Sequence, residues 1–406
     1  MNIIDSFPFL KNNKKLVYFD NSGTTLKPNE VIEAINKYYQ KYSINNHSGG
    51  GNSLFNEVHS TIQETRKIIA KRINAQSEEI IFSPSTTYSL NILALSLKKN
   101  VEKGDKICLT YLNHSSNSYP WQAIAQEKQA KVEFLDLNQN FTINVDNLNK
   151  YINQKTKIVT FPHISNSLGV INSVEEITKE IKKINPNCLV IIDACQSIAH
   201  LPINVKEWNI DALVFSGHKT YGPTGIGVFW IKKDLGEKLT NILWGGGKKS
   251  SPNEKIDKNL PLSQKFEVGT LPLAQIFGLK ASFEFLNNLE IEKIKKREEN
   301  LKNYLVKELS KLKEVTIYNY ETSAVNIILF NLKNYHPHDV ADYLGKNNIC
   351  VRAGNFCCPY LKKVIREESA IRISLALYNT KKDAKTLIEC LNKLIDRPDL
   401  IFDTFN

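Results

Sequence analysis

Two predicted strands near the middle of the chain deliver polar side chains that suit a carbonyl cofactor. The run CLVIIDA (188–194) ends near Asp193, and ALVFS (212–216) is followed by His218 and Lys219. Partial burial and cationic neighbours lower the pKa of a lysine, so that its amine can form a Schiff base with an aldehyde. A carboxylate can pair with a protonated pyridine nitrogen, which makes the ring an electron sink, although Asp193 alone would also fit a helix cap.

The start of a predicted helix offers a second kind of group. The strand-like run EEIIF (78–82) leads to Ser85, Thr86 and Thr87, which open a helical pattern over 86–99. Free N–H groups and hydroxyls at a helix start suit a phosphate, although an ordinary N-cap has the same residue types. Phosphate, pyridine nitrogen and aldehyde are the three handles of pyridoxal phosphate, and the chain offers a partner for each. The ordered set therefore predicts a site for this cofactor.

Two further segments follow predicted strands and suit the same ring. His114 comes after KICLTY (106–111), and its imidazole could stack on the pyridine, although an exposed loop histidine would look the same. Asn166 comes after KIVTFP (157–162), and either Asn166 or Gln196 could hydrogen-bond the phenolic oxygen. We expect these side chains at one edge of a sheet, because ligands of open parallel sheets bind beyond the carboxyl ends of the strands.

The elements that must position these residues alternate along the first two thirds of the chain. Short β-branched runs interleaved with helical patterns predict an α/β fold with a mainly parallel sheet of seven strands and helices on both faces. The predicted strands are 78–82, 106–111, 131–137, 157–162, 188–194, 212–216 and 227–231, and the predicted helices include 86–99, 118–129 and 173–184.

The last third of the chain is less regular. A polar stretch from Gly245 to Ser263 predicts a long loop. An amphipathic helix follows, and strand-like runs at 315–320, 324–332, 349–354 and 370–377 alternate unevenly with two further helices. We predict a large cofactor-binding domain over 17–283 and a smaller α+β domain formed by 1–16 with 284–406.

Composition narrows the function classes. The chain has 406 residues, 23% of them charged, and 53 Lys+Arg against 42 Asp+Glu give a net charge of +11. We attribute this excess to Lys interspersed with Glu on helix faces and expect no nucleic-acid partner. No apolar run is long enough to span a membrane and no secretory signal is evident. The seven cysteines then predict thiols in the cytoplasm.

Several motifs together resemble one known family. The ordered set is Asp193-Ala-Cys-Gln196, the run 215–225 (FSGHKTYGPTG), the run 266–270 (FEVGT), Arg352-Ala-Gly-Asn-Phe-Cys357 and the run 372–379 (RISLALYN). The chain resembles cysteine desulfurases of the SUF type (group II), which are related to selenocysteine lyases and share the class V aminotransferase fold (fold type I). The resemblance runs from YFDNSGTT (18–25) to ISLALYNT (373–380).

The resemblance implies a role for each matched residue. Lys219 would carry the Schiff base, His114 would stack on the ring, and Cys357 would be the catalytic cysteine that carries a persulfide. Thr270 would reach the phosphate of a second subunit, which implies a homodimer. Further cofactor contacts are implied for Thr86, Thr87, Asp193, Gln196, Ser216 and His218, and substrate contacts for Asn166, Arg352, Arg372 and His47.

The cysteine segment departs from the family pattern. Asn355 and Phe356 stand where two histidines are usual, and Cys358 directly follows Cys357. We predict Cys357 as the nucleophile because its spacing to Arg352 is kept, and nearby positive charge favours a thiolate. A disulfide between adjacent cysteines would be strained, and adjacent cysteines lack zinc-site spacing, so we expect two thiols and no metal. We expect the cysteines outside this pair to be buried: Cys108, Cys188, Cys195, Cys350 and Cys390.

The predicted reaction converts L-cysteine to L-alanine with a persulfide on Cys357. The sulfur would pass to an acceptor protein of the SUF system for iron–sulfur cluster assembly. A selenocysteine lyase, or another lyase or aminotransferase of this fold, is the alternative within enzymes. Ser48, which stands where the family often has arginine after Asn46-His47, leaves fine specificity open. An inactive, basic RNA-binding protein would have lost the lysine, the aspartate or the phosphate hydroxyls, and all are present.

Overall fold

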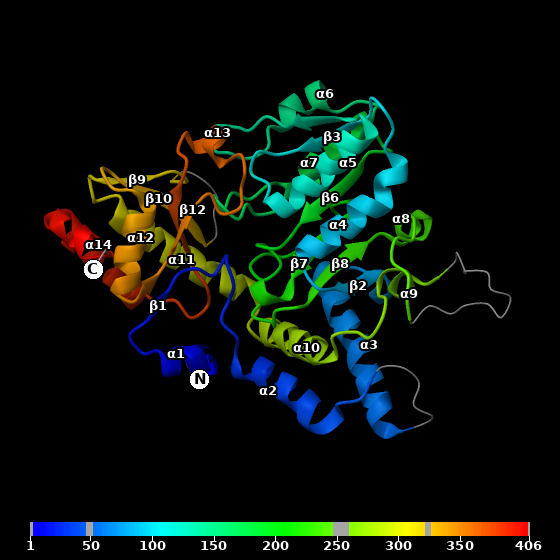
Figure 1. Ribbon diagram of the computed structural model, residues 1–406, viewed down its shortest axis with the longest axis horizontal. Helices are drawn as coiled ribbons and strands as arrows, with labels where there is room; N and C mark the ends of the chain where they lie inside the picture. The colour runs from blue at the N-terminus through cyan, green and yellow to red at the C-terminus, as the bar shows by residue number, and fades with distance from the viewer. Residues whose placement is uncertain (1–2, 46–51, 247–259, 321–325, 405–406) are drawn as a thin grey trace.

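A seven-stranded sheet occupies one half of the molecule (Figure 1). The structure is a computed structural model that describes residues 3–45, 52–246, 260–320 and 326–404. β8 is antiparallel to both its neighbours, β2 and β7, whereas the other pairs are parallel. The strand order is β2 (Ile80–Ser83), β8 (Gly227–Ile231), β7 (Ala212–Ser216), β6 (Leu189–Asp193), β5 (Thr156–Pro162), β3 (Lys106–Leu109) and β4 (Lys131–Phe134).

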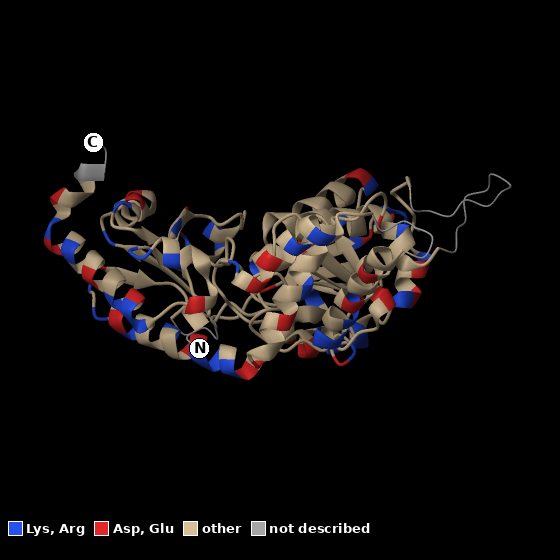
Figure 2. Cartoon of the chain, turned by 90° about the horizontal axis from the view of Figure 1, so that it is seen from below, with Lys and Arg blue, Asp and Glu red and all other residues tan. Residues whose placement is uncertain are grey.

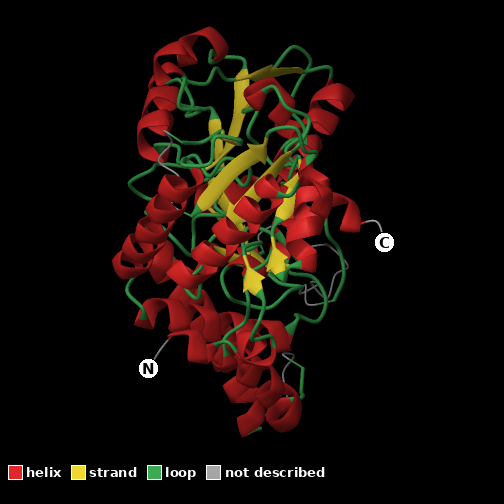
Figure 3. Ribbon diagram, turned by 90° about the vertical axis from the view of Figure 1, so that its left-hand side faces the viewer, coloured by secondary structure: helices red, strands yellow, loops and turns green. Residues whose placement is uncertain are grey.

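Helices pack on both faces of this sheet. Figure 3 shows the helices (red) around the strands (yellow) of the molecule. Side chains alternate across a strand, so neighbouring residues belong to different cores. In β6, Val190 and Ile192 pack with one helix layer, whereas Ile191 packs with the other. The first layer contains α3 (Ser53–Ile73), α7 (Val174–Ile184) and α10 (Leu273–Asn288), and the second α4 (Thr86–Leu97) and α5 (Tyr119–Lys128).

A second, antiparallel sheet builds the smaller half. Its strand order is β12 (Arg352–Gly354), β13 (Ala370–Ser374), β10 (Ile327–Leu332) and β9 (Val315–Ile317). The helices that pack on it are α11 (Ile291–Leu309), α12 (Pro337–Lys346) and α14 (Lys381–Asp396). β1 (Val17–Tyr18) pairs with β11 (Ile349–Cys350), so the N-terminal segment joins this half. The remaining helices are α1 (Pro8–Asn12), α2 (Asn29–Lys37), α6 (Leu148–Tyr151), α8 (Lys233–Lys238), α9 (Leu262–Phe266) and α13 (Leu361–Ile365).

The predicted α/β class and the mainly parallel seven-stranded sheet are confirmed. The run 349–354, predicted as one strand, is two short strands that belong to different sheets. Of the predicted loop 245–263, residues 247–259 lie outside the described part, and its end contains α9. The domain boundaries at 17 and 284 stay a prediction.

Charged side chains of both signs are interspersed along the helices of the face in Figure 2. On α11, for example, Glu308 pairs with Lys311 just beyond the helix end, at 2.8 Å. Within the described residues, no helix is both long and apolar enough to cross a membrane.

Candidate active site

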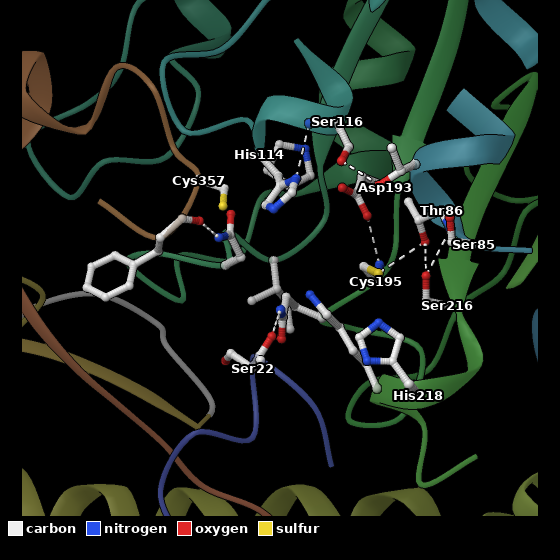
Figure 4. Close-up of a pocket in the computed structure, with 18 of the residues that line it drawn as sticks. Ser22, Ser85, Thr86, His114, Ser116, Asp193, Cys195, Ser216, His218 and Cys357 are labelled. Carbon is white, nitrogen blue, oxygen red and sulfur yellow. Dashed lines mark hydrogen bonds between the residues drawn. The ribbon is translucent and has the colours of Figure 1, made fainter. Parts of the chain in front are cut away.

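A cavity of about 240 Å³, lined mostly by residues with polar side chains, opens at the carboxyl edge of the large sheet, between the two halves (Figure 4). β2, β5, β6 and β7 contribute residues at or just after their carboxyl ends, and the small half contributes from β12, β13 and the segment between them. The predicted residues that line it are Thr86, Thr87, His114, Asn166, Asp193, Gln196, Ser216, His218, Lys219, Arg352, Cys357 and Arg372.

Lys219 ends a single helical turn that directly follows β7. The turn is tight against its surroundings, because a Cβ on Gly217 would lie 3.0 Å from the Ile226 side chain. The carbonyl of His218 accepts hydrogen bonds from the Thr25 N–H and from the Lys27 ammonium, at 3.0 and 3.1 Å. The backbone beside Lys219 is thereby fixed, and its amine points into the cavity.

The two histidines of the cavity are neutral near pH 7. Burial, reinforced by the positive charge of Lys219, lowers the pKa of His114 and of His218 to about 4. Nδ1 of His114 accepts a hydrogen bond from the Ser116 N–H at 3.1 Å. This bond is made at the edge of the ring and does not occupy its face. A neutral imidazole can stack on an aromatic ring without adding charge.

Asp193 ends β6 and is only 6% exposed. Burial raises the pKa of its carboxyl, while the Cys195 N–H bond and the charge of Lys219 oppose that shift. A buried carboxylate gains most from a cationic partner, and a protonated pyridine nitrogen is one. Gln196 donates its amide to the Ser22 carbonyl at 3.0 Å, which ties this edge to the N-terminal segment.

Hydroxyl groups gather at the start of α4. The Thr86 N–H donates to Ser216 Oγ at 2.9 Å, and the Ser216 hydroxyl donates to Thr86 Oγ1 at 2.8 Å. Thr87 Oγ1 and Ser116 Oγ share a hydrogen bond of 2.7 Å. A helix start that carries hydroxyls is suited to an anion such as a phosphate.

The segment that carries Cys357 is pinned to the large half. The Cys357 carbonyl accepts the Ser115 N–H at 2.7 Å, and the Phe356 carbonyl accepts the Asn166 side-chain amide at 2.7 Å. Phe356 and Cys357 both take left-handed backbone conformations, with φ of 58° and 55°. Such conformations are costly outside glycine and mark positions where the surroundings hold the backbone. The exposed thiol of Cys357 is thereby aimed into the cavity.

The neighbouring Cys358 is fully buried. Its thiol donates to the Tyr111 carbonyl at 3.3 Å, and burial raises its pKa to about 11. A protonated, enclosed thiol is a poor nucleophile, so the geometry favours Cys357 over Cys358.

Arg372 lies on β13 and is only 2% exposed. It donates to the Asn166 carbonyl and to the Asp20 carboxylate, both at 2.8 Å, and its guanidinium lies 4.9 Å from the centre of the Phe356 ring. Its Nε is buried and has no hydrogen-bond partner among the described residues. A planar donor held in this way is prepared for a carboxylate.

Two predicted residues are not in the cavity of this chain. Thr270 is exposed and does not line it; because the prediction places Thr270 at the site of a second subunit, it stays a prediction. His47 lies outside the described residues.

The expectation of buried packing is confirmed for Cys108, Cys188 and Cys390. It is wrong for Cys195, which is partly exposed and lines the cavity, with its sulfur 3.2 Å from Thr86 Oγ1. It sits two residues beyond β6, where the chain has already turned into the site. Cys350 is also partly exposed.

The sequence reasoning missed part of the wall. Ser22, Gly23 and Phe356 line the cavity. Asp20 does not line it but accepts a hydrogen bond from Arg372, which does. In the sequence, the segment 18–25 could be noticed only as the start of the family resemblance. It has no strand or helix pattern of its own, because it forms a loop at the end of the two-residue strand β1.

Comparison with known proteins identifies the family. Residues 17–387 match the model of the family "Aminotransferase class-V". The chain belongs to this family. A "Probable cysteine desulfurase" of Ureaplasma parvum is 39% identical and one of Halalkalibacterium halodurans 38%, each covering 95% of this chain and 96% of the relative. The solved cysteine desulfurase of Thermococcus onnurineus superposes with a TM-score of 0.89 at 34% identity, covering 97% of both chains.

Pyridoxal phosphate is the cofactor of this family, and the cavity fits it. Asp193 is a buried carboxylate that gains from a cationic ring nitrogen, the start of α4 supplies hydroxyls for a phosphate, and Lys219 supplies an amine for the aldehyde. These three groups line one cavity, as a single small molecule requires. Figure 4 shows Asp193 and the start of α4 at Ser85 and Thr86 on its wall. The chain is therefore a pyridoxal-phosphate enzyme of the cysteine desulfurase type.

Proposed function

We propose that the protein converts L-cysteine to L-alanine and takes the substrate sulfur onto Cys357 as a persulfide. The observation that carries this proposal is the position of an exposed thiol on the wall of the cavity that also contains Lys219 and Arg372. An aminotransferase needs no thiol there. The proposal also accords with the relatives, whose names give them this activity.

Arg372 is proposed to bind the α-carboxylate of L-cysteine, since its fork is fixed by Asp20 and Asn166 and its buried Nε has no hydrogen-bond partner in the described part of the chain. Arg352 lies near the cavity mouth and adds a second positive charge. These contacts orient the amino group of the substrate toward Lys219 and its side chain toward Cys357. Asn166 holds the Cys357 segment through the Phe356 carbonyl, and its own carbonyl accepts a hydrogen bond from Arg372. It therefore positions both Cys357 and Arg372.

The cofactor, when bound, supplies an electron sink for the carbon chemistry. Lys219 is proposed to hold it covalently, and its amine, once released, removes the α-proton of the substrate. The Cys357 thiolate then attacks the substrate sulfur, the carbon–sulfur bond breaks, and its electron pair goes to the carbon side. The β-carbon takes up one proton, Lys219 returns a proton to the α-carbon to complete L-alanine, and Cys357 keeps the sulfur as a persulfide.

We further propose that the persulfide is passed to an acceptor protein of the SUF system for iron–sulfur cluster assembly. Cys357 is exposed, which permits access by a partner. A homodimer, in which Thr270 contacts the phosphate of the second subunit and His47 contacts substrate, is proposed on the same family resemblance. A cytoplasmic location accords with the seven free thiols.

The test compares two matched variants, Cys357→Ala and Cys358→Ala, with L-cysteine and a thiol reductant under multiple turnover. We expect alanine formation to fall to background in Cys357→Ala. In Cys358→Ala it should remain within about fivefold of wild type, which corresponds to ~1 kcal/mol. Cofactor absorption of each variant checks that the protein is folded and loaded. Sustained alanine formation by Cys357→Ala would overturn the proposed role.

A further inference from the structure

Three charged side chains from three neighbouring segments meet beside the cavity. Arg352 on β12 and Arg372 on β13 are directly opposite each other in the antiparallel register. Asp20 lies along the same edge of β13 as β12, beyond the end of that strand, and forms a parallel bridge with Ser374, whereas β10 occupies the opposite edge. Its two carboxylate oxygens face different arginines: Oδ1 lies 2.8 Å from Nη2 of Arg372, and Oδ2 lies 4.0 Å from Nη1 of Arg352.

Hydrogen bonds to its backbone carbonyl hold Asp20 in place. The Asp20 carbonyl accepts the N–H groups of Gly23 and Thr24 at 3.1 and 3.3 Å, and the Tyr18 hydroxyl at 3.2 Å. Residue 23 must be small, because a Cβ there would lie 2.7 Å from Asp20 Oδ2. The position of the negative charge is therefore built into the turn that follows β1.

Asp20 changes what the two arginines can attract. Like charges directly opposite on paired strands repel each other, and the carboxylate offsets that repulsion. Two guanidinium groups and one carboxylate leave one net positive charge, which matches an amino acid that has a single carboxylate. Arg372 is the deeper of the two, with a side chain 3% exposed, whereas that of Arg352 is 45% exposed and lies on the strand that leads to Cys357. A substrate side chain directed at Cys357 therefore passes near Arg352.

We propose that Asp20 is a specificity-determining residue that selects amino acids with one carboxylate over amino acids with two. It acts through the arginines: it neutralises one of their two positive charges, so that this arginine pair has no positive charge left for a second carboxylate on the substrate side chain. The inference rests on the proposed binding of the substrate α-carboxylate at Arg372. A purely structural Asp20 would keep the arginines in place but would not affect this choice.

The experiment measures binding of L-aspartate and L-asparagine to the holoenzyme at pH 8. These amino acids have nearly the same shape and differ by one negative charge. Dissociation constants come from titrations followed by cofactor absorption, in wild type, Asp20→Asn and Asp20→Glu. Asp399→Asn is the matched control, because it removes a carboxylate that lies 2.7 Å from Arg397 on an exposed surface.

We expect the ratio of the dissociation constants for L-aspartate and L-asparagine to fall at least tenfold in Asp20→Asn. Asp20→Glu and Asp399→Asn should keep the wild-type ratio. A ratio that does not change in Asp20→Asn overturns the proposal, also when both amino acids bind more weakly, because Asp20 then only positions the arginines. Failure of both amino acids to bind any of the proteins overturns it as well. Desulfuration of L-cysteine is measured separately, so a failure of the proposed function is recognised independently of this ratio.

Discussion

A buried histidine beside the active-site strands should make the protein acid-sensitive. His163 follows β5 and is only 5% exposed, and its backbone N–H donates to the Asp193 carbonyl at 2.9 Å. Its ring packs edge-on against Trp208 with centroids 4.8 Å apart, and its buried Nδ1 has no hydrogen-bond partner among the described residues. Burial lowers the pKa of His163 to about 3, so the folded protein keeps this ring neutral down to that pH.

The sign and size of the effect follow from linkage. Unfolded, a histidine takes up a proton near pH 6.5, whereas folded His163 does so near pH 3. The unfolded state therefore binds more protons in between, and the free energy of unfolding decreases as the pH falls through that window. Between pH 7 and pH 5, about 1.5 pH units lie below the unfolded pKa, which at 1.36 kcal/mol per unit gives ~2 kcal/mol.

The assay is urea denaturation of the holoenzyme at pH 7 and pH 5, with wild type, His163→Phe and His59→Phe. Each value is the change in unfolding free energy between the two pH values. His163→Phe keeps an aromatic ring against Trp208 and removes the titrating group, so its change should be smaller than that of wild type by about 2 kcal/mol. His59 is exposed on α3, and its variant should behave like wild type. Equal changes in wild type and His163→Phe would refute the reasoning.

The remaining predictions concern cofactor and substrate. Arg372→Lys loses the planar fork, and the KM for L-cysteine in steady-state assays should rise about 10-fold or more, as expected for charge-assisted hydrogen bonds worth ~1.5–3 kcal/mol; an unchanged KM would contradict carboxylate binding there. Asp193→Asn removes the anionic partner of the ring nitrogen and should weaken cofactor affinity in equilibrium dialysis, whereas the same affinity as wild type would contradict that pairing. Gly227→Ala places a Cβ 2.8 Å from the Ser85 backbone, so it should displace the start of α4. Its affinity for the cofactor should then be weaker than that of wild type, so that a smaller dilution releases the cofactor.

The large sheet was predictable because its information is local. β-branched runs separated by helical patterns mark each strand, and the residues just after the strands meet at one edge whatever the details of packing. For this reason Lys219, Asp193, His114 and Thr86 were found from their order in the sequence, and all four line one cavity.

Other features depend on contacts that no local pattern records. Asp20 and Arg372 are 352 residues apart in sequence and meet only because the N-terminal segment docks along β13. The stack of Phe356 on Arg372 requires the left-handed backbone of the cysteine segment. A free cysteine such as Cys195 is usually buried in the core, and only the direction of the chain after β6 exposes it to the cavity.

The most direct test of the central claim locates the sulfur after a single turnover. The holoenzyme is mixed with one equivalent of L-cysteine, alkylated and analysed by peptide mass spectrometry, with Cys357→Ala and Cys358→Ala treated in parallel. One added sulfur atom should be found on Cys357 in wild type and in Cys358→Ala, with none in Cys357→Ala. Sulfur on Cys358, or alanine formed with no sulfur on either cysteine, would contradict Cys357 as the acceptor of the substrate sulfur.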